Sequence, residues 1–295
     1  ILAHSSLFEI YSAIRKKIFG GSSWQYSFER ITKSKHVNFC LLIDRWERYI
    51  RVISRNSAYI NKDFEFEDKT IFELGCGPLF GWSPLALFLG AKKYYYYEPN
   101  ISLNLLASEE MKEIYFLPLY NELVSNYGTR MEFEDFYSKI FRKTKEIDFN
   151  LKNSIDLTLS NSVLEHIPRN EIFETIKSLH DISKEKSYFF HVVDFGDHTS
   201  ASNKFKNMYK RDWSKATSQL NYLRMPDIEK LIKDAGFISN QKIVYRKSFF
   251  DKSNLHSSWK KYIDVDMDPR KMKDWIFHKN IVSQISKNRW SEGIY

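Results

Sequence analysis

Cysteine is scarce in this sequence, which holds only Cys40 and Cys76 among its 295 residues. Disulfide frameworks and zinc clusters both use larger sets of closely spaced cysteines. The scarcity therefore argues against either kind of scaffold. It also suits a reducing compartment, so we expect a cytoplasmic protein.

Long apolar runs are missing as well. No stretch approaches the roughly 20 consecutive apolar residues that a membrane-spanning helix needs, so we expect a soluble chain without a membrane span. Hydrophobic residues nevertheless make up 43% of the chain and aromatic residues 16%. A chain of this size and composition can bury a substantial core, which predicts a globular rather than a disordered protein.

The chain also lacks a strong block of charge of one sign, although its net charge is +8. Lysines are scattered among acidic residues along most of its length. Only the tail from residue 241 onward is skewed, with twelve Lys or Arg against six Asp or Glu. That skew suits either an anionic ligand or an ordinary solvated surface. The mixture elsewhere disfavours a nucleic-acid partner.

Glycine is rare too, and three of the ten glycines stand in "FELGCGPLFG". The strand pattern "KTIFELG" runs into this segment. "SPLALFLG" then predicts a helix with Ser83 as N-cap, Pro84 as first helical residue and Gly90 as its C-terminal stop. "KKYYYYE" predicts the next strand, because aromatic side chains suit a half-buried pleated surface. Strand, glycine loop, helix and strand together form a βαβ unit, which predicts a parallel sheet.

The alternation of strand and helix patterns continues along the chain. Strands are predicted at "SIDLTLSNS", "SYFFHVVDF" and "ISNQKIVYR", and helices at "PRNEIFETIKSLHDIS" and "MPDIEKLIKDAGF". This order predicts a doubly wound α/β core over residues 69–246. The stretch of about 101–149 is too long for one crossover helix and predicts a helical insertion. Residues 1–68 form an N-terminal helical segment, and 247–295 a C-terminal extension with "HKNIVSQISK" as a candidate last strand.

A carboxylate follows the glycine loop at a spacing that is typical of nucleotide-binding sites. Glu98 lies 21 positions after Gly77, at the end of the second predicted strand. This is the usual placement for a carboxylate that accepts hydrogen bonds from two ribose hydroxyls. Gly75 and Gly77 allow a ligand to approach the backbone, and Glu73 suits a ligand with a positively charged amino acid part. The alternative is a tight turn without a ligand.

The shape of the loop distinguishes between nucleotides. A nicotinamide site usually has a third glycine where this chain has Phe80, so that the helix packs tightly under a pyrophosphate. Here the helix start is moved back to Ser83 and Pro84, which widens the loop. These features disfavour a nicotinamide cofactor and favour S-adenosylmethionine. A nicotinamide-dependent oxidoreductase is the alternative.

At this point the sequence resembles a family. "IFELGCGP", "YYYYEPN" and "IDLTLSNSVLEHIP" look like the first, second and fourth motifs of class I S-adenosylmethionine-dependent methyltransferases, in that order. The resemblance covers about residues 69–246 and implies a Rossmann-like, mostly parallel seven-stranded sheet. It implies that Gly75 and Gly77 contact the methionine part, that Glu98 binds the ribose, and that Ser160 and Asn161 lie beside the methyl group.

Three departures and gaps qualify that resemblance. Many members have a third glycine where Leu79 stands, and Gly81 is its candidate substitute. The adenine-contacting residue is open among Glu134, Asp135 and Asp148. "SNSV" lacks the Pro-Pro-aromatic motif typical of enzymes that methylate exocyclic amines of adenine, which argues against that reaction.

A polar cluster follows the fifth predicted strand. "HVVDFGDH" supplies His191, Asp194, Asp197 and His198. If the strand ends after Asp194, near Gly196, the last three lie together at the carboxyl edge of the sheet, where such sheets bind ligands. Three interpretations stay open: a hydrogen-bonded loop that closes the site, a general base or binder for an acceptor hydroxyl, and a divalent metal site. We expect the catalytic role and no metal.

The same stretch resembles a subgroup associated with bacterial surface-glycan (capsule or O-antigen) synthesis, in which a His-x-x-Asp-x-x-Asp-His segment precedes an Asn-x-x-Arg pair. Here the pair is Asn221 and Arg224, predicted to bind substrate. Arg224 suits a carboxylate or phosphate of the acceptor, or else a surface position at a helix start. "YFLPLYNELVSNYG" is also similar and implies a helix near the acceptor pocket. His166 is interpreted mainly as structural.

Together these features predict a class I methyltransferase that uses S-adenosylmethionine to methylate a small polar acceptor, a hydroxyl of a sugar or sugar phosphate. Three alternatives stay open: a nicotinamide-dependent oxidoreductase, a catalytically inactive S-adenosylmethionine-binding protein, and an RNA methyltransferase suggested by net charge alone.

Overall fold

The computed structural model describes residues 39–56, 64–99, 101–193, 220–221, 223 and 225–237. The chain divides into two compact units. The first covers Ile1–Leu159 and Ser183–Tyr188, and the second covers Ser160–Ile182 and Phe189–Tyr295. The domain boundaries predicted at residues 68 and 246 stay predictions.

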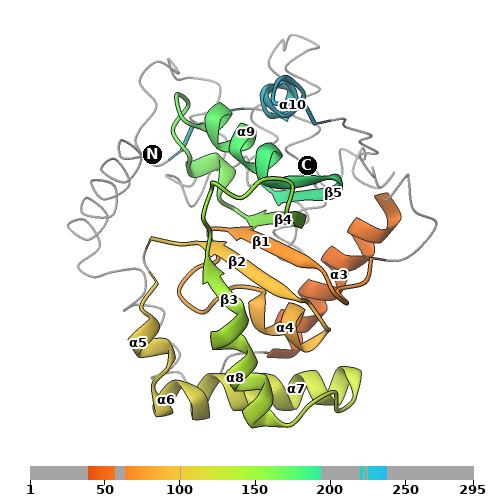
Figure 1. The fold of residues 1–295 in the computed structure, drawn as a ribbon, viewed down its shortest axis with the longest axis vertical. Coiled ribbons are helices and arrows are strands. Elements are labelled where there is room, and N and C mark those ends of the chain that lie inside the picture. The colour runs from red at the N-terminus through yellow and green to blue at the C-terminus, as the bar shows by residue number, and fades with distance from the viewer. Residues whose placement is uncertain are drawn as a thin grey trace, which may run out of the picture. The chain divides into compact units, whose positions relative to one another are not determined.

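A five-stranded sheet organises the described residues (Figure 1). Its strands are β1 (Thr70–Leu74), β2 (Lys93–Tyr97), β3 (Thr144–Glu146), β4 (Ile155–Asn161) and β5 (Ser183–Val192), in the order β3-β2-β1-β4-β5. The pairs β1–β2 and β2–β3 are parallel. This confirms an α/β fold with a parallel sheet, of which five strands are described. The two further strands predicted after residue 237 lie outside the described residues.

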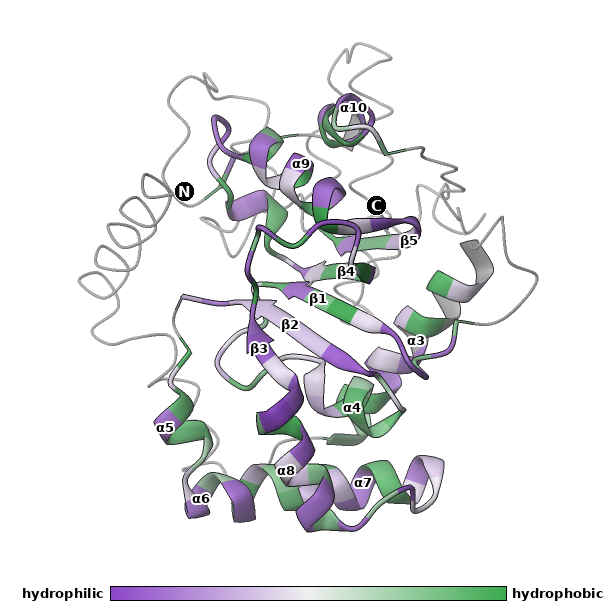
Figure 2. Ribbon diagram, viewed as in Figure 1, coloured by the Kyte–Doolittle hydropathy of each residue, from purple (hydrophilic) through white to green (hydrophobic). Residues whose placement is uncertain are grey.

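Helix α4 (Ser83–Phe88) connects β1 to β2 and is buried along its whole length. Figure 2 shows it as mainly apolar, whereas β2 is pale because tyrosine has intermediate hydropathy. Gly90 has φ 101° and ends the helical region as predicted. The prediction of Ser83 as N-cap is wrong: the cap is Trp82, and the buried Ser83 hydroxyl hydrogen-bonds Thr144 Oγ1 instead.

The stretch between β2 and β4 is mainly helical. It contains α5 (Leu103–Leu106), α6 (Glu109–Met111), a π-helical turn (Lys112–Phe116), α7 (Leu117–Tyr127) and α8 (Phe133–Lys143). The π turn ends two residues before Pro118, whose missing N–H removes an α-helical bond to the carbonyl of Ile114. Helix α8 packs on α4 and runs into β3, a three-residue strand that no sequence pattern singles out.

Helix α3 (Phe39–Asn56) confirms the helical spacing of apolar residues before the core. Its Trp46 ring stacks on Phe66 and on Trp82, with centroids 5.0 and 4.9 Å apart. Tyr49 meets the edge of Trp82 at 5.4 Å. Since Trp82 caps α4, this aromatic stack helps to fix the amino end of α4.

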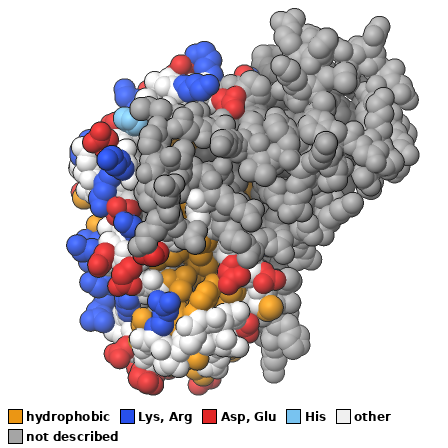
Figure 3. Space-filling model, turned by 90° about the vertical axis from the view of Figure 1, so that its right-hand side faces the viewer, with side chains coloured by type: hydrophobic (Ala, Val, Ile, Leu, Met, Phe, Trp, Pro, Cys, Tyr) orange, Lys and Arg blue, Asp and Glu red, His pale blue; other side chains and the backbone are white. Residues whose placement is uncertain are grey.

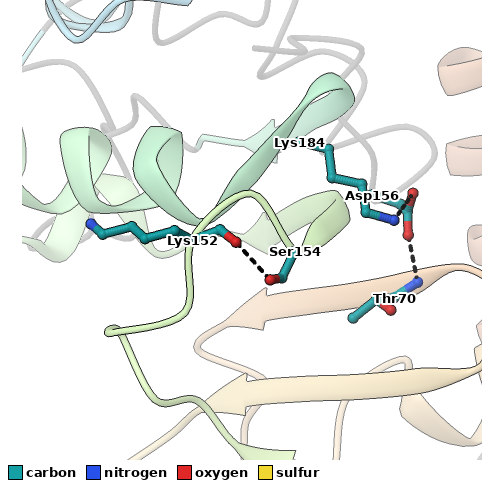
Figure 4. Close-up of polar contacts among 5 residues, drawn as sticks. All are labelled: Thr70, Lys152, Ser154, Asp156 and Lys184. Atoms are coloured by element: carbon teal, nitrogen blue, oxygen red, sulfur yellow. Dashed lines mark hydrogen bonds and ion pairs between the residues drawn. The ribbon is translucent and has the colours of Figure 1, made fainter.

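Asp156 ties together the amino ends of three strands (Figure 4). Its carboxylate accepts a hydrogen bond from the Thr70 backbone N–H and pairs with Lys184 Nζ, both at 2.8 Å. Thr70 begins β1, Asp156 lies near the start of β4, and Lys184 near the start of β5. Because these contacts lie at the amino edge, they stabilise the sheet at the end remote from the glycine loop.

In the second unit, α9 (Ile172–Ile182) packs against α10 (Met225–Asp234). Both helices were expected from their sequence patterns. The face of α9 that is buried carries Ile172, Ile176 and Leu179, whereas Phe173 is only half-buried. Within the part of the chain that the structure describes, no helix has the length and apolar character to cross a membrane.

Candidate functional site

The glycine loop after β1 and the carboxylate after β2 are in direct contact. The parallel register pairs Leu74 with Tyr97, and Gly75 N–H continues the ladder to the Tyr97 carbonyl at 2.9 Å. Two residues further along the loop, Gly77 N–H donates to Glu98 Oε2 at 3.0 Å. The two features that the sequence places 21 positions apart thus meet at the carboxyl edge of two neighbouring strands.

The loop has room for a ligand beside this contact. Gly75 and Gly77 have φ of 71° and 69°, a left-handed conformation that favours glycine. A Cβ added to Gly77 would meet no atom within 4 Å, so open space adjoins the loop there. Glu98 is only half-buried. An open glycine turn beside a half-buried carboxylate fits a polar, hydroxyl-bearing ligand such as a ribose.

Glu73 lies under the loop rather than on its open side. Its carboxyl is 2% exposed, and Oε2 accepts hydrogen bonds from Trp82 N–H at 3.0 Å and from the Tyr94 hydroxyl at 2.5 Å. Burial raises the pKa of Glu73 to about 7, although these two bonds act in the opposite direction. The structure places Glu73 as the acceptor that holds the amino end of α4.

Gly81 is the glycine that this arrangement requires most. Its φ is 50°, and an added Cβ would lie 2.6 Å from Glu73 Cδ, 2.7 Å from Oε1 and closer still to Oε2. Gly81 therefore lets the loop pass directly over the Glu73 carboxyl. The sequence comparison with a three-glycine motif singles out this residue, but only the structure shows what it packs against.

Phe80 anchors the widened loop in the core. It has φ of 62°, which is unfavourable for a residue with a large side chain, and its ring is almost fully buried. The ring packs against Tyr96 and Phe141, both with centroids 5.7 Å away. Aromatic packing in the core offsets the backbone strain at this position.

The three candidates for the adenine contact lie in different places. Asp148 follows β3 at the carboxyl edge, accepts from Asn150 N–H at 2.9 Å, and precedes Phe149, whose ring contacts Tyr97. Glu134 and Asp135 occupy the first turn of α8. Because α8 enters β3 at its amino end, its first turn lies away from the carboxyl edge. Glu134 pairs there with Lys112 at 2.9 Å.

In the second unit, two predicted site residues form a buried pair. Ser160 Oγ and His191 Nδ1 are 2.7 Å apart, and the side chains are 1% and 0% exposed. Burial lowers the pKa of His191 to about 3, so the imidazole is neutral near pH 7. Its Nε2 is buried and has no hydrogen-bond partner among the described residues. Phe189 covers the ring at 4.0 Å.

Asn221 is bound to the loop that follows β4. Its amide donates to the carbonyls of Leu164 and Ile167 at 2.6 and 2.9 Å, and its Oδ1 accepts from Leu223 N–H at 3.0 Å. The Arg169 guanidinium donates to its carbonyl at 2.5 Å. These contacts give Asn221 a structural role, and its predicted contact with substrate stays a prediction.

The remaining candidates are only partly visible. Asn161 ends β4 half-buried, and His166 is half-buried in a short 3-10 helix, Leu164–His166. Asp194, Asp197, His198 and Arg224 lie outside the described residues. Among the residues that are described, no group of three His, Cys, Asp or Glu side chains is arranged to hold a metal ion.

A comparison with protein-family models and one with curated proteins gave no match. Solved structures do match. An S-adenosylmethionine-dependent methyltransferase from Mesorhizobium loti is 16% identical, with a TM-score of 0.35 over 59% of this chain and 77% of that one. One from Archaeoglobus fulgidus is 12% identical, with a TM-score of 0.38 over 72% and 74%.

A phosphoethanolamine N-methyltransferase from Haemonchus contortus, solved with phosphomonomethylethanolamine and S-adenosylhomocysteine, is 15% identical. Its TM-score is 0.38, and the match covers 65% of this chain and 37% of that one. The chain is thus structurally similar to S-adenosylmethionine-dependent methyltransferases. All three TM-scores are below 0.5, so the ligands of this chain have to be inferred from its own residues.

Proposed function

We propose that this chain is an S-adenosylmethionine-dependent methyltransferase whose acceptor is a hydroxyl of a small sugar or sugar phosphate. The observation that supports it most is the hydrogen bond from Gly77 N–H to the Glu98 carboxylate beside an open glycine turn. When bound, the cofactor supplies an activated methyl group on a sulfonium. Glu98 would accept hydrogen bonds from its ribose hydroxyls, and Asp148 from its adenine amine.

The buried Glu73 carboxyl supports this cofactor over a nicotinamide dinucleotide. In dinucleotide sites the pyrophosphate lies at the amino end of the helix after the first strand. Here that end is already bound to an acidic side chain, since Trp82 N–H donates to Glu73 Oε2. A pyrophosphate at the same place would meet a carboxyl group instead of free N–H donors.

We propose that the residues that follow β5 bind the acceptor and remove its hydroxyl proton. Transfer to a hydroxyl forms a carbon–oxygen bond, breaks the carbon–sulfur bond and leaves the hydroxyl proton for a base. His191 holds a proton poorly because it is buried, so we propose that it positions Ser160. Asp194, Asp197 or His198 would take the proton, and Arg224 would bind an anionic group. The glycan acceptor rests on sequence resemblance alone.

A small acceptor also agrees better than RNA with the charges on the described part of one face of the molecule. On the face shown in Figure 3, Lys and Arg side chains are interspersed with Asp and Glu. Binding to a nucleic-acid backbone would instead be favoured by a continuous basic stripe and would weaken steeply with salt. Binding of an RNA oligonucleotide with such a salt slope would favour the RNA methyltransferase alternative.

The test of the cofactor is calorimetric titration with S-adenosylhomocysteine and, in parallel, with NAD. We expect the folded chain to bind the homocysteine compound and not NAD, and Glu98→Ala to weaken that binding at least tenfold because two ribose bonds are lost, each worth about 1 kcal/mol. Glu134→Ala is the matched control, since that carboxylate is exposed on α8. Equal binding by both variants, or preference for NAD, would overturn the proposal.

A second experiment separates an enzyme from a catalytically inactive binding protein. S-adenosylmethionine would be incubated with a panel of nucleotide sugars and sugar phosphates, and formation of S-adenosylhomocysteine measured. Turnover with one of them identifies the acceptor class. Cofactor binding with no turnover across the panel would favour the inactive protein.

A further inference from the structure

One acidic side chain under the glycine loop has an unusual setting. Glu73 is fully buried, yet among the described residues no Lys, Arg or His forms an ion pair with it. A buried carboxylate normally has a cationic or strongly hydrogen-bonding environment that repays its lost hydration. Glu73 has two donors, Trp82 N–H and the Tyr94 hydroxyl, both on one oxygen.

The titratable groups around Glu73 add no positive charge next to it. Three tyrosines lie near it: Tyr94 on β2, Tyr49 on α3 and Tyr115 in the π-helical turn. Burial raises the pKa of each phenol, and the charge of Glu73 raises it further. All three phenols are therefore neutral near pH 7. The positive charge of Arg45 lowers the pKa of Tyr49, but burial outweighs this effect.

Two more acidic groups lie in or beside the loop. The Cys76 thiol has a raised pKa from burial and from the charges of Glu73 and Glu98, and Glu98 also raises the pKa of Glu73. Among the described residues, the titratable groups coupled directly to Glu73 are therefore neutral phenols, a neutral thiol and a second carboxylate, while the Arg45 cation acts on Tyr49. A positive charge placed near the loop would stabilise the ionised form of Glu73.

We propose that Glu73 is a proton-coupled positioning residue: it is protonated in part of the free molecules and releases its proton when a positively charged S-adenosylmethionine binds at the loop. This inference rests on the proposed cofactor. In the step, the O–H bond of the Glu73 carboxyl breaks and the proton passes to solvent. The carboxylate that forms is the stronger acceptor for Trp82 N–H and the Tyr94 hydroxyl, so the loop is held more firmly in the bound state.

The proposal predicts how cofactor affinity varies with pH. A pKa of about 7 means that close to half of the free molecules carry the proton at pH 7. If the bound state is fully ionised, affinity rises about tenfold between pH 6 and pH 8 and then levels off. S-adenosylhomocysteine lacks the sulfonium charge, so its affinity has the smaller dependence on pH.

The experiment is calorimetric titration with S-adenosylmethionine at pH 7 in phosphate and in Tris buffer, which differ in ionisation enthalpy. We expect the difference in heat to report release of about half a proton per cofactor bound. Glu73→Gln keeps an oxygen that accepts from Trp82 and Tyr94 but carries no titrating proton. Its binding heat should be the same in both buffers, and its affinity should change less than twofold from pH 6 to pH 8.

A second variant keeps the test decisive if Glu73→Gln does not fold. Tyr94→Phe removes a hydrogen bond that favours ionised Glu73, so the midpoint of the affinity–pH curve should move to higher pH. Cys76→Ser is the control and should leave the midpoint in place. An unmoved midpoint in Tyr94→Phe overturns the proposal.

The remaining outcomes are distinct from one another. Binding of S-adenosylmethionine by the wild type with equal heats in the two buffers would overturn proton coupling and leave the cofactor assignment intact. Buffer-dependent heat that persists in Glu73→Gln would assign the proton to another group and likewise overturn it. A folded wild type that binds no S-adenosylmethionine would overturn the proposed function itself.

Discussion

Replacing Gly81 by alanine should destabilise the chain more than the same change at Gly77, although both glycines are in one loop. Both have left-handed backbone conformations, with φ of 50° and 69°. That conformation costs a residue with a Cβ about 1–2 kcal/mol. At Gly77 this is the whole cost, because the added atom would meet nothing within 4 Å.

At Gly81 a second cost is added. The Cβ would overlap the Glu73 carboxyl group, which is buried and fixed by Trp82 N–H and the Tyr94 hydroxyl. Overfilling a packed interior costs about 1–3 kcal/mol. The expected loss in the free energy of unfolding is therefore about 2–5 kcal/mol for Gly81→Ala, against about 1–2 kcal/mol for Gly77→Ala.

Urea unfolding followed by circular dichroism measures the two losses, provided that both variants keep the slope of the wild type. A double variant identifies the contact: with Glu73→Ala present, the penalty of Gly81→Ala should shrink toward that of Gly77→Ala, since the overlapping group is gone. Equal losses at the two glycines, or a penalty unchanged by Glu73→Ala, would refute the packing of Gly81 on Glu73.

Two further predictions concern the second unit. Asn221→Ala should lower the free energy of unfolding by about 1–3 kcal/mol in urea unfolding, because it leaves the buried carbonyl of Ile167 without a donor and removes the shorter of the two hydrogen bonds to that of Leu164; unchanged stability would contradict this. His191 has a folded pKa near 3 against 6.5 for the free side chain, so the unfolded chain binds more protons between these values and stability falls as pH drops. The loss from pH 6.5 to pH 4 is about 3 kcal/mol, and His191→Gln should abolish that part of it, seen in thermal unfolding across pH.

The contact between Gly77 and Glu98 is the part of the site that could be predicted most directly. It follows from spacing, since parallel neighbouring strands end at the same edge and a loop after one lies beside the residue after the next. Strand β3 shows the limit of that approach. It is three residues long, two of them exposed, so no alternating or apolar pattern distinguishes it from the end of α8.

Side-chain orientation is the second limit. The residue types at positions 160 and 191 indicate a polar site, but their hydrogen bond depends on the register of β4 and β5, which the sequence does not specify. The partners of Asn221 are 54 and 57 positions away, beyond the reach of any local pattern. Glu73 has the residue type expected of a ligand-binding acid, and only the structure shows that both of its bonds are made inside the fold.

The two acidic residues of the loop differ in their exposure to solvent, and this difference suits them to different roles. Glu98 is half-buried and accepts from Gly77 N–H beside the open turn, where a ligand hydroxyl can replace solvent. Glu73 is on the other side of the same loop, where burial makes its charge costly and ties its ionisation to whatever positive charge arrives above. Exchanging their settings would remove both effects: an exposed Glu73 would titrate like any surface acid, and a buried Glu98 would be out of reach of a ribose. The two glycines differ in the same way: Gly77 leaves open space beside the loop, and Gly81 allows its close approach to the acid beneath it.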